Sequence, residues 1–99
     1  MGIKLKIVTP NGIFIDDKDV DIINVKTIDG DMGILKNMAP FVTALKISNL
    51  NFKEKGQITY VHVYRGLMVV THEQCKIITE RLYLVDAQGN RIDTPLKLD

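Results

Sequence analysis

The sequence has few of the residues that mark several common protein classes. It has no tryptophan, one cysteine and three prolines among its 99 residues. The lone Cys75 cannot form an internal disulfide, which fits a reducing compartment. No apolar run approaches the roughly 20 residues that a membrane-spanning helix needs, and we expect no signal-like leader. We therefore expect one soluble domain, because about 100 residues can bury a single core but cannot hold a separate catalytic domain.

The chain also lacks an excess of either charge. Its 13 lysines and arginines nearly balance its 12 aspartates and glutamates, and neither sign forms a long run. Domains that bind nucleic acid usually carry a basic face, so this balance argues against a nucleic-acid partner. We expect its partners to be recognised by the shape of the surface.

Two sequence patterns resemble parts of metal sites, and each lacks a required residue. Asp17, Asp19 and Asp21 have the spacing that opens a calcium-binding loop, but Ile22 and Ile28 occupy the positions that need a glycine and a bidentate glutamate. This excludes an EF-hand and favours a solvated connection.

The second pattern is His72-x-x-Cys75, which offers two soft ligands, with His62 as the only other histidine. A tetrahedral site would need one more ligand. The same Cys75 could act as a nucleophile with a histidine base, but it begins an apolar alternating segment and is expected in the core. The glycines are dispersed among turns and none opens a helix, so we expect no phosphate loop and no cofactor.

Alternating apolar and polar residues recur along the whole chain. Residues 3–7 alternate isoleucine or leucine with lysine, which is the period of a strand with one buried face. The same reasoning predicts further strands at residues 13–15, 20–26, 33–35, 41–46, 50–53, 57–64, 67–71, 75–80 and 83–85. Turn residues separate them, and no segment keeps a helical period. We predict an all-β fold, a sandwich or barrel, with a core in residues 1–85 and a turn and weak C-terminal tail at 86–99.

The most specific sequence pattern lies at residues 29–45, D-G-D-M-G-I-L-K-N-M-A-P-F-V-T-A-L. Asp29-Gly30 is a strong turn dipeptide, and Ala39-Pro40 bends the chain instead of allowing a helix. This stretch resembles the epsilon subunit of F-type ATP synthases, whose pattern is close to E-G-x-x-G-I-L-P-x-H-A-P-L-V-T-x-L. It departs at Lys36 and Met38, where the family usually has proline and histidine. Weaker likenesses at residues 5–10 and 64–70 extend the resemblance over about residues 3–80, with Arg65 another departure.

The resemblance implies a two-sheet β-sandwich of about ten short strands that catalyses nothing. It implies a central-stalk subunit that binds the gamma subunit and couples it to the c-ring of an ATP synthase. The acidic turn would meet the polar loops of the c-ring, and the segment from Met38 to Thr43 would lie against gamma. Implied partner-binding residues are Asp29, Asp31, Met38, Pro40, Thr43 and Thr9, although Pro40 and the nearby glycines could equally serve only the fold. The expected location is cytoplasmic, on the inner face of the cell membrane through the complex.

Several alternatives stay open. Epsilon subunits usually continue into two C-terminal helices, whereas no such pattern follows Glu80 here, so we expect no C-terminal helical domain and no inhibition through one. The chain could instead be the gamma-binding subunit of an F-type-like ATPase that lacks a c-ring. A third reading is a small β-sandwich enzyme that uses His72 and Cys75.

Overall fold

The structure, a computed structural model, describes residues 2–98. These residues form ten strands and no helix, and therefore no helix that could cross a membrane. The strands are β1 Ile3–Thr9, β2 Gly12–Val20, β3 Ile22–Thr27, β4 Gly30–Ile34, β5 Phe41–Leu45, β6 Ser48–Glu54, β7 Gln57–Val63, β8 Gly66–Val70, β9 Gln74–Thr79 and β10 Leu82–Val85. The all-β prediction is confirmed.

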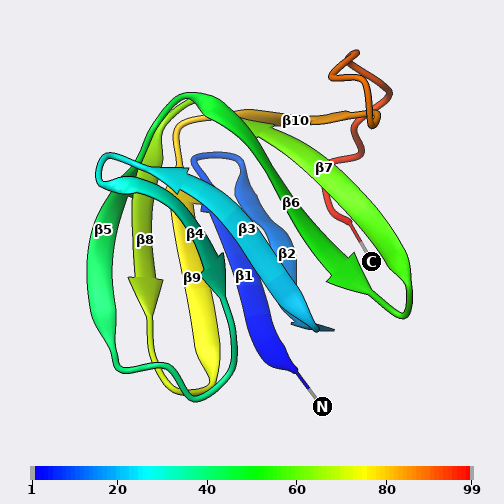
Figure 1. The fold of residues 1–99 in the computed structure, drawn as a ribbon. Helices are drawn as coiled ribbons and strands as arrows, with labels where there is room; N and C mark the ends of the chain where they lie inside the picture. The colour runs from blue at the N-terminus through cyan, green and yellow to red at the C-terminus, as the bar shows by residue number, and fades with distance from the viewer. Residues whose placement is uncertain (1, 99) are drawn as a thin grey trace.

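All ten strands belong to one hydrogen-bonded sheet that curls over itself into two layers (Figure 1). Strand β3 connects the layers: its first half pairs with β6, whereas its last residue, Thr27, pairs with Leu45 of β5. We call β4, β3, β6, β7 and β10 sheet I, and β5, β8, β9, β1 and β2 sheet II. All pairings are antiparallel except that of β1 with β9, which is parallel. The predicted sandwich is thus present, with its layers joined through one strand.

The core lies between the two sheets and follows from the period-two alternation. In β1, Ile3, Leu5 and Ile7 are fully buried, while Lys4 between them is exposed. Successive side chains of a strand point to opposite faces, so one face of each strand contributes to the core and the other faces outward. The other large side chains that are fully buried include Ile15, Ile23, Ile34, Leu50, Phe52, Met68 and Ile77.

Strand β2 is longer than the sequence predicted, because the charged residues that follow Ile15 continue the strand. Asp17 adopts a positive φ of 51°, and the pairing of β2 with β1 shifts register in this region, as at a β-bulge. The predicted strand 13–15 with a charged connection was therefore wrong in its boundary.

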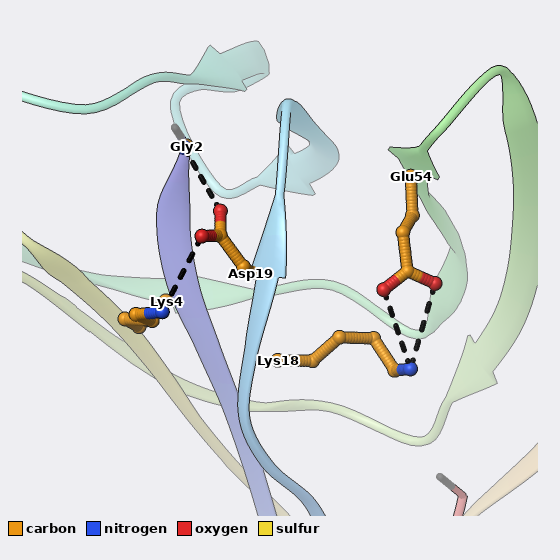
Figure 2. Close-up of polar contacts among 5 residues, drawn as sticks. All are labelled: Gly2, Lys4, Lys18, Asp19 and Glu54. Atoms are coloured by element: carbon orange, nitrogen blue, oxygen red, sulfur yellow. Dashed lines mark hydrogen bonds and ion pairs between the residues drawn. The ribbon is translucent and has the colours of Figure 1, made fainter.

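The charges of β2 are paired across strands (Figure 2). Asp19 accepts a hydrogen bond from the Gly2 amide at 2.8 Å and lies 3.4 Å from Lys4 Nζ. The Gly2 amide, and then Lys4, hold the pKa of the Asp19 carboxyl below its ordinary value. Lys18 contacts both carboxylate oxygens of Glu54, on β6 of sheet I, at 3.5 Å. Of the spaced acidic residues, Asp19 is thus paired with Lys4 across the strands, whereas Asp17 accepts a hydrogen bond from Gln74 Nε2 at 2.8 Å.

The C-terminal tail runs from sheet I back to sheet II. Ile92 donates a hydrogen bond to the Leu84 carbonyl of β10 at 3.0 Å, and Leu98 donates one to the Phe14 carbonyl of β2 at 2.7 Å. The Leu98 side chain packs against the core. The tail therefore connects one edge strand of each layer.

Candidate protein-interaction surface

The acidic turn is a tight hairpin between β3 and β4. Thr27 Oγ1 accepts a hydrogen bond from the Asp29 amide at 3.0 Å and donates one to the Gly30 carbonyl at 2.8 Å. Gly30 has a φ of 117°, a conformation that glycine adopts without a Cβ clash. These contacts leave the Asp29 side chain exposed at the end of sheet I. Asp31, also exposed, lies 3.6 Å from Lys26 Nζ on the paired strand.

The proline-containing loop, residues 35–40, lies at the opposite end of β4. The Asn37 amide donates to the His72 carbonyl at 2.7 Å, which ties this loop to the turn between β8 and β9. Met38 is half-buried against the core, and its Sδ accepts a hydrogen bond from the Leu35 amide at 3.2 Å. Pro40 is exposed at the start of β5.

The predicted residues therefore do not form one compact site. Thr9 lies at the same end as the acidic turn, where its Oγ1 accepts the Asn11 amide at 3.1 Å and its side chain lines a hollow shared with Ile28. Thr43 is half-buried in the middle of β5, opposite Met68 of β8. Figure 1 shows the two loops at opposite ends of the sandwich. Any partner that touches both loops must extend over the length of the sandwich.

A row of apolar side chains crosses the outer face of sheet II, and sequence reasoning missed it. The cross-strand pairs that make it are Ala44–Leu67, Leu67–Ile78, Ile78–Val8 and Val8–Ile13. Leu67 is 43% exposed, Ile78 42% and Ile13 40%. We call these five residues, one from each strand of sheet II, the apolar row.

The apolar row borders a shallow hollow of about 770 Å³ that also involves Thr9, Pro10 and Ile28. Ile28 is 61% exposed at its rim, and Arg65 and Glu80 form an ion pair of 3.9 Å at the same end. A contiguous apolar face with a polar rim is typical of a surface that binds another protein. Alternation predicts that these side chains point outward, but only the strand order brings them together.

Cys75 and His72 do not form a catalytic pair. Cys75 is fully buried in β9, and burial raises the pKa of its thiol to about 12. His72 is exposed in the turn before that strand. A thiol that stays protonated at neutral pH is a poor nucleophile and a poor metal ligand. Within residues 2–98, no group of three or more histidine, cysteine or acidic side chains is arranged to hold a metal ion.

The fold is that of a small β-sandwich domain whose most distinctive surface feature is an apolar outer face. Residues 2–85 match the sequence family described as "ATP synthase, Delta/Epsilon chain, beta-sandwich domain", and the chain belongs to that family. The resemblance stated from residues 29–45 is thereby confirmed.

Curated relatives agree with this assignment. The ATP synthase epsilon chain of Thermotoga maritima is 38% identical over 77 residues, which cover 78% of this chain and 70% of the relative. The epsilon chain of Symbiobacterium thermophilum is 34% identical over 84% of this chain and 60% of its own length. That of Thermodesulfovibrio yellowstonii is 29% identical over 92% of this chain and 59% of its own. The chain thus spans about 60% of the length of two of these relatives.

Solved structures share the fold. A chain in the Euglena gracilis mitochondrial ATP synthase, in a structure of OSCP, F1 and c-ring, superposes with a TM-score of 0.80 at 20% identity, covering 88% of this chain and 57% of that chain. A chain of the Tetrahymena thermophila mitochondrial ATP synthase central stalk and c-ring gives a TM-score of 0.72 at 17% identity, covering 84% and 66%. At these identities the likeness supports the fold.

Proposed function

We propose that this chain is a non-catalytic central-stalk subunit of a rotary F-type ATP synthase, which binds gamma and couples it to the c-ring. Family membership and the epsilon chains among its relatives support the subunit type. The observation that carries the docking proposal is the apolar row. Three of its side chains, Ile13, Leu67 and Ile78, are exposed to water, and they would gain from being covered by another protein.

Gamma is proposed to cover the outer face of sheet II. Burial of side chains such as Leu67 and Ile78 would supply the affinity, and the Arg65–Glu80 pair at the rim would fix the orientation. The exposed Pro40 directly precedes β5, the first strand of this sheet. Thr43 lies within β5 opposite the fully buried Met68, so its side chain is on the inner face of the sheet and would support the docking face from below. Met38 would act by holding the loop in place, since its sulfur is already bound to the Leu35 amide.

The c-ring is proposed to meet the end of the sandwich that carries the acidic turn, next to the rim of the face proposed for gamma. Asp29 and Asp31 are exposed there, and Thr9 lies in the neighbouring turn. Carboxylates at this end suit lysine or arginine side chains on ring loops. The domain would sit on the inner face of the cell membrane only through the complex.

A coupling element must resist deformation, and a close-packed interior between two sheets provides that resistance. In this proposal the domain transmits force through packed side chains and carries out no chemistry. It needs no cofactor for this task.

The test is to co-express gamma with Ile78→Asp and with the matched variant Ile58→Asp. Ile78 lies in the apolar row, whereas Ile58, 49% exposed, lies in β7 of sheet I. We expect Ile78→Asp to weaken gamma binding by about a hundredfold or more, because a charge would be buried in an apolar contact, and Ile58→Asp to bind normally. Equal binding by both variants would rule out sheet II as the docking face.

A second candidate is the gamma-binding subunit of an F-type-like ATPase without a c-ring. The departures from the family pattern at Lys36, Met38 and Arg65 support this candidate. Purification of the native complex separates the candidates: c-subunits that co-purify support the first, and gamma without c-subunits supports the second.

A further inference from the structure

The outer face of sheet I carries a cluster of aromatic and cationic side chains that the proposed stalk function does not use. His62 and Tyr83, paired across β7 and β10, stack with ring centroids 4.7 Å apart. The Arg91 guanidinium lies 4.5 Å from the centre of the Tyr83 ring, and that of Arg81 lies 4.3 Å from the centre of the Tyr64 ring. Together with Leu82, these residues line one hollow of about 280 Å³.

Local contacts hold the cluster in position. His62 Nδ1 donates to Asn49 Oδ1 at 2.7 Å, which fixes the imidazole ring. The Arg81 carbonyl accepts hydrogen bonds from the Tyr64 amide at 3.1 Å and from Thr79 Oγ1 at 3.3 Å. Arg91 forms a β-bridge with Val85 of β10. The two guanidiniums are therefore carried by anchored backbone.

Neither guanidinium has an acidic partner in the part of the chain that the structure describes. The five ion pairs there join Lys4–Asp19, Lys6–Asp16, Lys18–Glu54, Lys26–Asp31 and Arg65–Glu80. An arginine stacked on an aromatic ring keeps the N–H groups at the edge of its guanidinium plane available as donors. Arg81 and Arg91 thus present two unneutralised charges to one hollow.

We propose that this hollow binds a phosphate monoester. A phosphate monoester carries about 1.5 to 2 negative charges at neutral pH and three acceptor oxygens, which matches two guanidiniums, whereas a single carboxylate would neutralise only one. The hollow is larger than a phosphate group alone, so the organic part of the ester can contact the rings of Tyr64 and Tyr83.

The test is a titration of the whole chain with phenyl phosphate, followed by backbone amide resonances at constant ionic strength. We expect saturable shifts at residues 62–64, 81–83 and 91. Arg81→Gln and Arg91→Gln should each weaken binding by about tenfold or more, because each removes charge-assisted hydrogen bonds. The control Lys53→Gln removes one positive charge from an exposed position of β6 that does not line the hollow, and should leave the affinity unchanged.

Vesicles of phosphatidylcholine with and without phosphatidic acid distinguish the source of the phosphate. Sedimentation with phosphatidic acid that depends on Arg81 would identify a lipid headgroup, and phenyl phosphate binding without sedimentation would identify a soluble ester. The proposal is overturned if phenyl phosphate causes no saturable shift, if chloride at equal ionic strength causes the same shifts, or if the arginine variants bind as the native chain does.

Discussion

The outer faces of the two sheets differ, although the same alternation of residues builds both and one core lies between them. Sheet II presents the apolar row, from Ala44 through Leu67, Ile78 and Val8 to Ile13. At the corresponding face of sheet I, Asn24 Nδ2 donates to Asn51 Oδ1 at 3.0 Å, and Asn49 accepts from His62. One face is suited to burial against a protein, and the other to water and polar ligands.

This difference separates stability from function at the level of single residues. Inward side chains of both sheets hold the fold, whereas outward side chains of sheet II cost little when left in water and gain only when a partner covers them. Adjacent positions on one strand should therefore have opposite roles.

The largest difference is expected between Ile77 and Ile78 of β9. Ile77 is fully buried and Ile78 is 42% exposed. Ile77→Ala should lower the free energy of unfolding by about 2–5 kcal/mol through lost burial and a cavity. Ile78→Ala should lower it by about 0.5 kcal/mol or less while still weakening gamma binding. Urea denaturation measures the unfolding free energy of both variants. Similar losses of stability would show that the outer face is part of the stabilising core.

Gly66 tests how closely β8 and β9 must approach to form the apolar row. A Cβ at Gly66 would lie 2.2 Å from the Ile78 carbonyl oxygen, so the backbone must move. Gly66→Ala should lower the free energy of unfolding by about 1–3 kcal/mol, as overpacking does. It should also weaken gamma binding, because Leu67 and Ile78 would separate.

The matched control for Gly66 lies in sheet I. A Cβ at Gly33 of β4 would lie 3.3 Å from Ile22 Cδ1, the end of a flexible side chain. Gly33→Ala should therefore leave the free energy of unfolding nearly unchanged and gamma binding intact. An equal effect of both substitutions would contradict the close approach of β8 and β9 as the cause.

The buried thiol of Cys75 should make the free energy of unfolding depend on pH. Burial raises the pKa of its thiol from 9.0 to about 12, so the folded state disfavours the thiolate. The unfolded chain loses this proton at a lower pH than the folded one, and stability that is fully present below pH 9.0 is lost as pH rises toward 12. Relative to Cys75→Ala, the native chain should lose about 1.4 kcal/mol of unfolding free energy per pH unit in this window.

Urea denaturation of both chains between neutral and alkaline pH gives this difference and cancels the titration of other groups. Native Cys75 should also resist alkylation by iodoacetamide at neutral pH. A parallel pH dependence of the two chains, or rapid alkylation, would show that the thiol is accessible and would revive the enzyme reading.

Much of the fold could be predicted from the sequence because strand alternation and turn residues are local signals. The dipeptide Asp29-Gly30 predicted a turn, and Pro40 predicted a bend before a strand that begins at Phe41. The structure has both the hairpin and the strand. The boundary of β2 failed because a bulge at Asp17 lets charged residues continue in a strand by pairing across it. Nothing in the local pattern marks that bulge.

The apolar row could not be predicted, because its members are neighbours only through pairings between distant strands. Val8 meets Ile78 across a parallel pair, and Ala44 meets Leu67 across an antiparallel one. Alternation indicates that each side chain points outward but does not give the order of the strands. The resemblance to epsilon subunits implies the proposed partners and loop residues, and the strand order adds the apolar surface of sheet II.

A substitution at Asp31 is expected to change the free energy of unfolding least, and yet to weaken assembly with the c-ring strongly. It lies 3.6 Å from Lys26, with side chains 76% and 54% exposed, and a pair this exposed contributes about 1 kcal/mol or less. Asp31→Lys should therefore change the free energy of unfolding little, weaken docking on the c-ring by charge repulsion and leave gamma binding nearly intact. The control Asp21→Lys makes the same change at an exposed position outside the acidic turn and should leave both interactions unchanged. If Asp31→Lys reduced ring and gamma binding equally, the two partners would share one surface, and the contrast between the acidic end and the apolar face would not divide their roles.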